Sequence, residues 1–586
     1  MQLDSSRKTL EGTQTLTWEN PGTKPVDQLY FHLYPNAFMS KNTTFMLESG
    51  GKLRNDKMKE GSFGSMTVSK ILTLDGKDLT PSLQYVRPDD GNQNDYTLAR
   101  IRLPQAVMPH EKVTLRMNFT DKLPVVFARM GYLNDFIMAG QWFPKIAVYE
   151  PKGTRGLTED AWNLHQYHGD SEFYADFGTF DVNIKVPTDY IVAATGFPYK
   201  PPSASNGFKT YHYYAEDVHD FAWAASPHFQ YVEEPFSAPN IPGVKIKLYL
   251  QPGQSMLKDR YMLAAKKALR DYSDWFGPYP YSTLSIVIPP AVGNGAGGME
   301  YPTLVTGWSA DQTTEGHGLE RVIVHEIGHQ FWYAMVASNE FEEAWLDEGF
   351  TSFAEDMVMQ QEYDIRPNIP IQASYITSPE ALNRYAWQYG SHGKYAENVY
   401  MRAKLVLLGI EKQIGGQDMI RVLKAYFTQW KFKHPNTLDF EQTLERVTKK
   451  SWKPYFDQFV YNASMEDFAV SSIHVQRVNQ KGTTEYKSEV VIVKNGGSYG
   501  NVPIYFHFAD GTNKQSVWNP TNNRVKYEFV YSSPIDWTVI DPDYSQVLEN
   551  KHINNFMRTS IDVPTELRWN IGASKVIEMI TRWLAW

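Results

Sequence analysis

His325, Glu326 and His329 lie in the stretch L-E-R-V-I-V-H-E-I-G-H-Q-F-W-Y-A-M-V, and their spacing suits metal chemistry. Residues four apart on a helix lie one above the other, so the two imidazoles would point at the same place. Glu326 would lie roughly 100° around the helix, beside a metal rather than on it, where a carboxylate can act as a base. The neighbouring positions are apolar, which indicates a buried helix. A ligand role therefore explains the histidines better than a solvated helix face does, because unpaired polar groups are costly to bury.

Two histidines leave such a site incomplete, because catalytic zinc normally takes three protein ligands and keeps a fourth position for water. Glu348 follows His329 after 18 intervening residues, within the helical pattern of E-E-A-W-L-D-E-G-F-T-S-F-A-E. A second, antiparallel helix could bring its carboxylate to the metal. Zinc lowers the pKa of a bound water toward ~7, and an adjacent carboxylate can take the proton while the hydroxide attacks a carbonyl carbon. The pattern indicates hydrolysis without a covalent intermediate.

The elements that must position these residues fall into four segments of the 586-residue chain. Residues 1–242 show short alternating runs between P-G and D-G turn signals, which predicts a β-rich domain. Helical periodicity dominates residues 243–468, which also hold a glycine-rich loop ahead of the histidine helix. Alternation returns over residues 469–550, as is typical of a small β-sandwich, and residues 551–586 form a tail with an amphipathic helix. The sequence predicts a multidomain α+β protein.

The composition disfavours some partners. The formal net charge is −9, with 57 basic against 66 acidic residues, so the chain lacks the basic footprint of a nucleic-acid-binding protein. No run of 18 apolar residues indicates a transmembrane span. We expect the amphipathic helix of the tail to dock on the protein, and contact with a membrane surface is the less favoured interpretation. The sequence leaves the oligomeric state open.

The compartment is also left open. The chain has no cysteine, which excludes thiolate ligands and fits exported and cytosolic proteins equally well. Its start, M-Q-L-D-S-S-R-K, lacks the layout of a signal peptide but resembles a strand already in progress. If an upstream segment has been removed, we expect an exported or cell-envelope protein, and otherwise a cytoplasmic one.

Four motifs of the chain resemble those of the M1 zinc aminopeptidases, which are gluzincin metallopeptidases. In chain order they are G-G-M-E-Y-P, H-E-I-G-H-Q-F-W, W-L-D-E-G-F and Y-F-D-Q-F-V-Y-N-A. The resemblance covers most of the chain and implies a thermolysin-like, mostly helical catalytic domain with one zinc ion per chain. The substrate it implies is a peptide with a free N-terminus. Only about 36 residues follow the predicted sandwich, so the chain resembles a short form without the large helical C-terminal domain of many members.

The same resemblance implies roles for residues of the histidine helix and beyond. Three residues would bind zinc: His325, His329 and Glu348. Glu326 would be the general base. The family's oxyanion tyrosine precedes a basic residue at the start of a helix, and N-V-Y-M-R-A-K-L matches best, which makes Tyr400 the donor. Tyr395, five residues earlier, is the alternative, and either could instead be a half-buried core tyrosine.

By resemblance, the glycine-rich loop and one N-terminal residue would bind the substrate. Glu300, with Gly298 and Met299 beside it, would hold the free α-amino group, and a carboxylate fixed one residue's length from the metal selects exopeptidase geometry. Gln141 in G-Q-W-F-P-K resembles the glutamine that reaches the first substrate pocket; from the residues alone, a loop packed on the sheet is favoured. Most members have Asn where this chain has Tyr301, so one contact to the substrate backbone is in doubt.

Two other functions compete with an aminopeptidase. A zinc endopeptidase with an open cleft would cut N-acetylated peptides as well as free ones. A noncatalytic scaffold that binds partner proteins is less favoured, because the chain keeps the base and all three ligands. Four acidic residues near the site would favour cationic substrates if they faced the cleft, although their pattern is more typical of a solvated face: Glu340, Glu342, Glu343 and Asp347.

Overall fold

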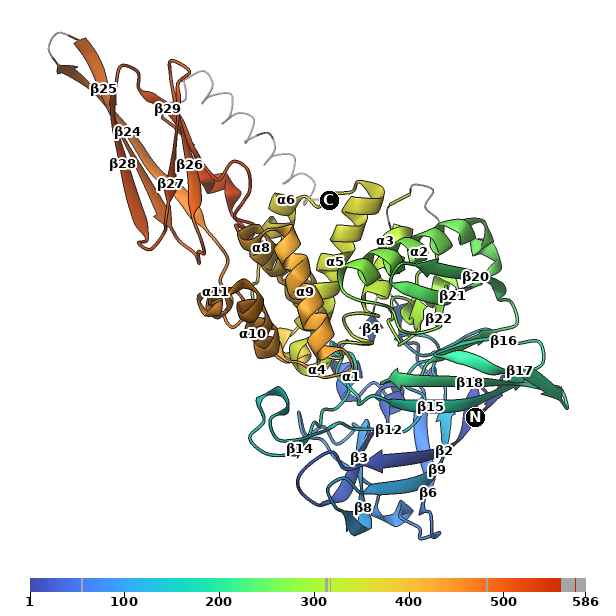
Figure 1. Cartoon of the computed structure of the whole chain (residues 1–586). Helices are drawn as coiled ribbons and strands as arrows, with labels where there is room; N and C mark the ends of the chain where they lie inside the picture. The colour runs from blue at the N-terminus through green and yellow to red at the C-terminus, as the bar shows by residue number, and fades with distance from the viewer. Residues whose placement is uncertain (54–55, 311–314, 317, 481–482, 560–574, 576–586) are drawn as a thin grey trace. The chain divides into compact units, whose positions relative to one another are not determined.

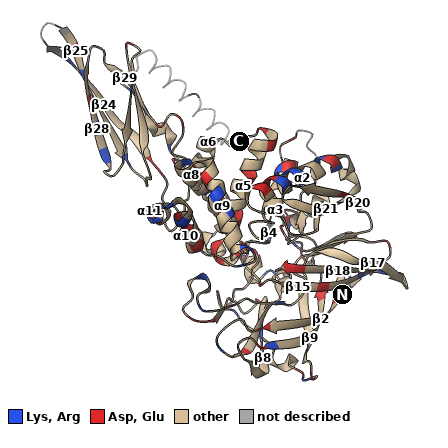
Figure 2. Ribbon diagram, viewed as in Figure 1, with Lys and Arg blue, Asp and Glu red and all other residues tan. Residues whose placement is uncertain are grey.

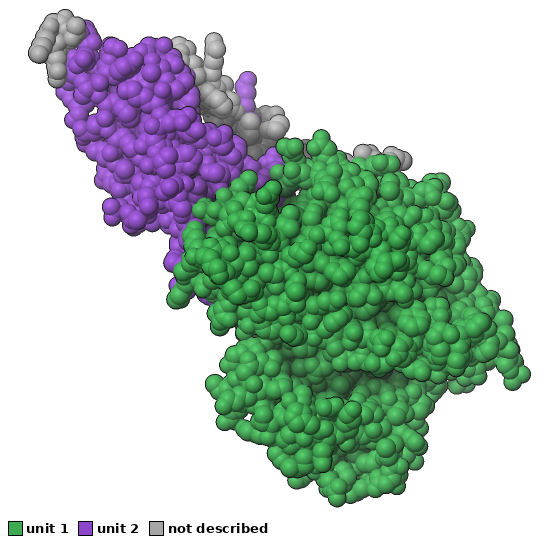
Figure 3. Space-filling model, in the orientation of Figure 1, with its two compact units in different colours: residues 1–367, 380–453 green, residues 368–379, 454–586 purple. Residues whose placement is uncertain are grey.

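The computed structural model describes most of the chain (Figure 1). The described residues are 1–53, 56–310, 315–316, 318–480, 483–559 and 575. They fall into two compact units, which Figure 3 colours separately: unit 1 holds residues 1–367 and 380–453, and unit 2 holds residues 368–379 and 454–586. The predicted C-terminal amphipathic helix lies outside the described residues, apart from Lys575. No helix in the described part of the chain is long and apolar enough to cross a membrane.

The first half of unit 1 is built on a seven-stranded sheet in the order β17-β18-β15-β1-β2-β9-β6. Its strands are β1 (Gln2–Asp4), β2 (Thr9–Glu19), β6 (Ser65–Thr73), β9 (Lys112–Lys122), β15 (Gly178–Pro187), β17 (Phe197–Ser205) and β18 (Phe208–Val218). Strands β2 and β9 are antiparallel and pair without interruption. Thr9 lies opposite Lys122 at one end, and Glu19 lies opposite Lys112 at the other. A Cβ atom at Gly12 would lie 2.1 Å from the ring of Phe119, so glycine lets that ring cross the strand.

Two four-stranded sheets complete this β-rich half, in the orders β10-β11-β19-β16 and β12-β3-β8-β7. Their strands are β3 (Val26–His32), β7 (Gln84–Tyr85), β8 (Leu98–Val107), β10 (Gly131–Leu133), β11 (Phe136–Ala139), β12 (Lys145–Ile146), β16 (Ile191–Ala194) and β19 (Trp223–Ser226). Every residue of β11 and β19 is buried. Smaller elements here are η1 (Tyr34–Phe38), α1 (Thr44–Glu48), η2 (Thr80–Ser82), η3 (Thr154–Gly156) and the strand pairs β4 (Lys52–Leu53) with β5 (Asp56–Lys57) and β13 (Tyr149–Glu150) with β14 (Ala161–Trp162).

The second half of unit 1 begins with a sheet in the order β20-β21-β22-β23. Its strands are β20 (Gln230–Ala238), β21 (Ile241–Leu250), β22 (Thr283–Val287) and β23 (Leu304–Thr306). Strands β21, β22 and β23 run parallel, and the crossover from β21 to β22 contains η4 (Pro252–Leu257) and helix α2 (Lys258–Trp275). The glycine-rich loop, with η5 (Ala291–Ala296), joins β22 to β23. It therefore leaves the end of one buried strand and returns to the next.

Helices make up the rest of unit 1. They are α3 (Gly318–Gly328), α4 (Glu340–Glu343), α5 (Trp345–Tyr363), η6 (Ala386–Tyr389), α7 (His392–Ala396), the π-helix η7 (Glu397–Arg402), α8 (Ala403–Ile414), α9 (Gly416–Trp430) and α10 (Thr437–Thr448). A Cβ atom at Gly349 would lie 2.5 Å from the Cβ of Ala403, so this glycine lets α5 approach α8 closely. Acidic and basic residues are interspersed along helices such as α2 and α9 (Figure 2).

Unit 2 contains two small antiparallel sheets, β24-β25-β28 and β27-β26-β29-β30. Their strands are β24 (Phe468–Gln480), β25 (Thr483–Lys494), β26 (Val502–Phe508), β27 (Asn513–Trp518), β28 (Arg524–Tyr531), β29 (Ile535–Ile540) and β30 (Phe556–Arg558). The unit also holds α6 (Ile369–Ser374), η8 (His552–Asn555) and most of α11 (Lys453–Phe459). Alternate residues of β26 are buried in the shared core, with Phe468 and Ile492. The predicted fold class is confirmed in the β-rich region, the helical region and the C-terminal sheets; the boundaries at residues 242, 468 and 550 stay predictions.

Candidate active site

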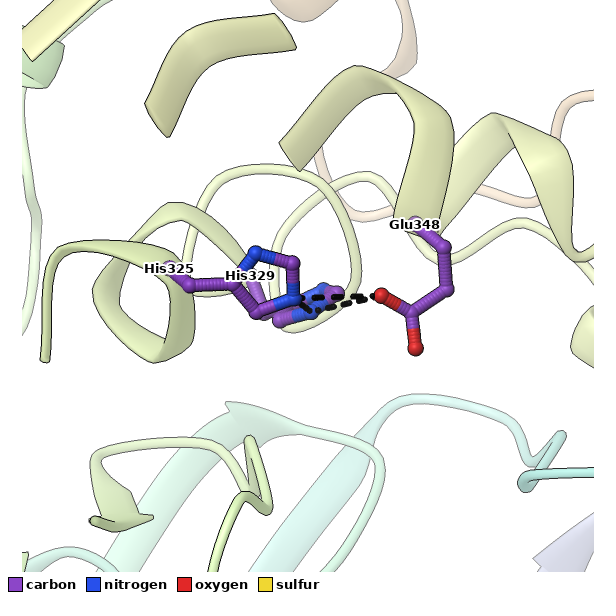
Figure 4. Close-up of side chains that lie close together, drawn as sticks. All are labelled: His325, His329 and Glu348. Carbon is purple, nitrogen blue, oxygen red and sulfur yellow. Dashed lines mark hydrogen bonds and ion pairs between the residues drawn. The ribbon is translucent and has the colours of Figure 1, made fainter. Parts of the chain in front are cut away.

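Three possible metal ligands converge from two helices (Figure 4). His325 lies on α3, His329 follows directly after the last residue of that helix, and Glu348 lies in the first turn of α5. The two Nε2 atoms are 3.1 Å apart, and Oε2 of Glu348 is 3.2 and 3.3 Å from them. Neighbouring donors around a tetrahedral zinc at about 2.0–2.1 Å stand roughly 3.3–3.4 Å apart. The donor set fits a single zinc ion.

Each histidine is held by a carboxylate on its other nitrogen. Nδ1 of His325 is 2.9 Å from Oε2 of Glu355, and Nδ1 of His329 bonds Asp347 and lies 3.2 Å from the hydroxyl of Thr351. Such partners fix the ring orientation and leave Nε2 for a metal. Glu355 was not predicted from the sequence, although it follows Glu348 by seven residues and therefore lies two turns further along the same face of α5.

The electrostatics of the triad formed by His325, His329 and Glu348 favour a positive charge. Burial disfavours the imidazolium form of both histidines, but Glu348 and the other nearby carboxylates outweigh it and raise the pKa of each histidine to about 10. The two histidines in turn hold the pKa of Glu348 below its usual range, against the effect of burial. Carboxylates that stabilise protons on two buried imidazoles will also stabilise a metal cation between them.

Two further predicted residues lie beside the triad. Glu326 is 4% exposed on α3, and its charge acts on the pKa of His329. The hydroxyl of Tyr400, from the π-helix η7, donates a hydrogen bond to Oε1 of Glu348. Burial and the charge of Glu348 raise the pKa of Tyr400, so it stays a proton donor. The ring of Tyr395 lies 6.0 Å from that of Tyr400, and its buried hydroxyl has no hydrogen-bond partner among the described residues.

The glycine-rich loop brings Glu300 close to this centre. Gly298 has a left-handed φ of 65° and donates to the carbonyl of Thr306 at 2.6 Å, and Met299 forms a β-bridge with Thr306. Glu300 is 4% exposed, and one of its oxygens lies within 4.8 Å of carboxylate oxygens of Glu340 and Asp347. Burial raises the pKa of Glu300 well above its ordinary value.

Tyr301 and Gln141 lie where the loop meets the β-rich half. The hydroxyl of Tyr301 donates to the carbonyl of Arg129 at 3.4 Å, and a Cβ atom at Gly140 would lie 2.0 Å from that hydroxyl. Gln141 is buried, has a φ of 57° and donates through Nε2 to Asp220. The departure from the family pattern therefore puts a tyrosine into the packing between the loop and the β-rich half.

The expectation of a solvated acidic face is wrong. Glu340 and Asp347 are fully buried, and Glu340 accepts a hydrogen bond from the backbone of Phe173 at 3.2 Å. Glu342 lies 3.0 Å from Nε2 of His165 and is also paired with Arg155, and Glu343 is half-buried. Asn163, His165 and Phe173 of the N-terminal half bond the side chains of Glu340 and Glu342 on α4, and these long-range contacts shield the two carboxylates from water.

The comparisons with known proteins include the region that carries this site. Residues 261–459 match the description Peptidase family M1 domain. Aminopeptidase M1-C of Oryza sativa subsp. japonica is 23% identical over 321 residues, which cover 51% of this chain and 35% of that protein. Glutamyl aminopeptidase of Rattus norvegicus is 24% identical over 285 residues, with 45% and 30% covered. The chain thus spans about a third of the length of these curated relatives.

Solved structures share the fold. Legionella pneumophila aminopeptidase A, in complex with aspartic acid, matches with a TM-score of 0.60 and 12% identity over 92% of this chain and 57% of that one. An M1 zinc metallopeptidase from Deinococcus radiodurans matches with a TM-score of 0.52 and 18% identity over 76% and 88%. The chain shares the fold of these structures, and its histidine–glutamate site could hold a metal ion. Residues 261–459 thus resemble the peptidase domain of family M1.

Proposed function

We propose that this chain is a zinc-dependent aminopeptidase that removes N-terminal residues from peptides. One observation carries the proposal: the buried Glu300 lies close to a residue that bonds one of the candidate metal ligands. One of its oxygens lies within 4.8 Å of an oxygen of Asp347, and Asp347 bonds the ligand His329. A carboxylate at that place suits the ammonium of a free N-terminus, provided that the scissile bond follows the first residue.

The chain's own residues supply the remaining parts of the reaction. Zinc, when bound by His325, His329 and Glu348, supplies a Lewis acid that polarises the peptide carbonyl and activates water. Glu326 takes the proton from the attacking water and delivers it to the leaving amine. The hydroxyl of Tyr400 donates a hydrogen bond to the oxyanion that forms on the carbonyl oxygen.

The support for each role is geometric. Glu326 follows His325 directly on α3, so helix geometry turns its carboxylate beside, rather than onto, the position of a metal that His325 and His329 would bind. Tyr400 already bonds a metal ligand, and its raised pKa keeps the proton that an oxyanion needs. The names of the relatives, aminopeptidases in both cases, agree with an exopeptidase.

The experiment compares an aminoacyl chromogenic substrate with its N-acetylated form, for the wild type and for Glu300→Gln. We expect the wild type to prefer the free amine, and the isosteric variant to lose most of that preference while its zinc content stays the same. Equal or faster cleavage of the acetylated form by the wild type would reject the aminopeptidase in favour of an endopeptidase. No turnover of either form, with zinc bound, would favour the noncatalytic scaffold.

A further inference from the structure

Gln330 follows the ligand His329 directly and is fully buried. Its side-chain amide bonds a single segment, the loop that carries Glu300. Nε2 donates to the carbonyl oxygens of Glu300 and Tyr301, both at 3.2 Å, and Oε1 accepts from the backbone N–H of Thr303 at 2.7 Å. An amide group has two N–H donors, so both are used here. One side chain thus ties the end of the histidine helix to the amine-binding loop.

The loop needs such a tie because its backbone is strained at this point. Thr303 has a φ of 60°, a left-handed conformation that β-branched residues rarely adopt. Conformations of this kind persist only where the surroundings enforce them, and they gather at functional sites. Gln330 holds the N–H of Thr303, and the backbone N–H of Gly196 donates to the hydroxyl of Thr303 at 2.7 Å. The strained residue is fixed from both sides, three positions after Glu300.

We propose that Gln330 is a positioning residue that sets where the Glu300 carboxylate stands relative to the metal ligands, and thereby enforces the requirement for a free N-terminus. The proposal rests on the proposed role of Glu300 in binding the α-amino group. Glu300 and His329 are 29 positions apart in the sequence, so the chain itself does not fix their separation. Gln330 does, because it is covalently next to one and hydrogen-bonded to the backbone of the other.

The loop has a second support that should survive the loss of Gln330. The backbone N–H of Arg129 donates to the carbonyl of Gly295 at 2.8 Å, and the hydroxyl of Tyr301 donates to the carbonyl of Arg129 at 3.4 Å. These contacts attach the loop to the β-rich half, on both sides of Glu300 in the sequence. A Gln330 variant should therefore shift Glu300 rather than release the whole loop.

The test measures the ratio of kcat/KM on a free aminoacyl substrate to that on its N-acetylated form. Gln330→Met keeps the side-chain length but removes the amide. We expect kcat/KM on the free substrate to fall about 10- to 100-fold, as for a small misplacement of a binding group, with the acetylated substrate unchanged within about twofold. Zinc content, measured by elemental analysis, should stay at the wild-type level because both histidines are intact.

A matched control is Gln546→Met in unit 2, which removes another buried glutamine whose Nε2 donates to the carbonyl of Asn501 at 3.1 Å. It should leave the substrate ratio unchanged. If Gln330→Met does not fold, Gln330→Asn carries the test, because it keeps the amide one methylene short and should lower the ratio by a smaller factor.

The possible results distinguish a failure of the positioning role of Gln330 from a failure of the proposed aminopeptidase function. A wild type without preference for the free amine rejects the proposed function itself. A preference that Glu300→Gln removes but the Gln330 variant keeps overturns the positioning role alone. An equal fall on both substrates, or a loss of zinc, likewise overturns it, since Gln330 would then support only the fold of the helix end.

Discussion

The metal end and the amine end of the candidate site are built in different ways. At the metal end, His325 and Glu348 come from two facing helices, and the partner of each histidine lies on α5 as well. At the amine end, Glu300 lies in a loop whose backbone is held by Gln330, just beyond the end of α3, and by Arg129 from the β-rich half. The metal end therefore depends on helical spacing, whereas the amine end depends on contacts between distant segments.

The largest expected effect belongs to the metal end. Glu326→Gln removes the proposed proton acceptor and should lower kcat by about 10²- to 10⁴-fold. Because Glu326 serves the chemistry and not amine recognition, free and acetylated substrates should lose activity by the same factor, with zinc content unchanged. Steady-state kinetics on both substrates check this. A selective loss on the free substrate would mean that the two ends are not separate.

The next effect concerns Tyr400, the proposed oxyanion donor. Tyr400→Phe should lower kcat by about 10²- to 10³-fold, the usual cost of removing one such donor. Tyr395→Phe is the matched control, since the ring is also buried in the same cluster but its hydroxyl has no hydrogen-bond partner among the described residues. It should change kcat by less than about threefold. The reverse order would make Tyr395 the donor.

A smaller effect is expected for Glu355, which orients the candidate ligand His325. Glu355→Gln keeps the shape but weakens the hydrogen bond to Nδ1 of His325, and it should lower zinc affinity by about 10- to 100-fold. Glu362→Gln, further along α5, is the control because its carboxylate pairs with Lys267 and Arg270 instead. Titration with a competing chelator measures the affinity. Activity should return at saturating zinc, and failure to return would give Glu355 a role beyond holding the histidine.

The metal end could be predicted from the sequence because its geometry is local. The spacing of His325 and His329 fixes two imidazoles on one side of a helix, and the same periodicity would have found Glu355 from Glu348. The hydrogen bonds of Gln330 could not be predicted, since its partners lie about 30 positions earlier and no periodicity connects them. The burial of Asp347 could not be predicted for the same reason, because contacts with residues far away in the sequence decide it.

The smallest effect is expected at Tyr301, where the amine end contacts the β-rich half. Tyr301→Phe removes the 3.4 Å hydrogen bond to Arg129 while the ring continues to fill the space against Gly140. A bond that long contributes little, at most about 1 kcal/mol, so KM for the free substrate should rise less than about fivefold and kcat should hold. Because Gln330 makes three shorter hydrogen bonds to the loop, its loss should cost more. A larger effect from Tyr301→Phe than from Gln330→Met would reverse that order and make the β-rich half the main support of the amine end.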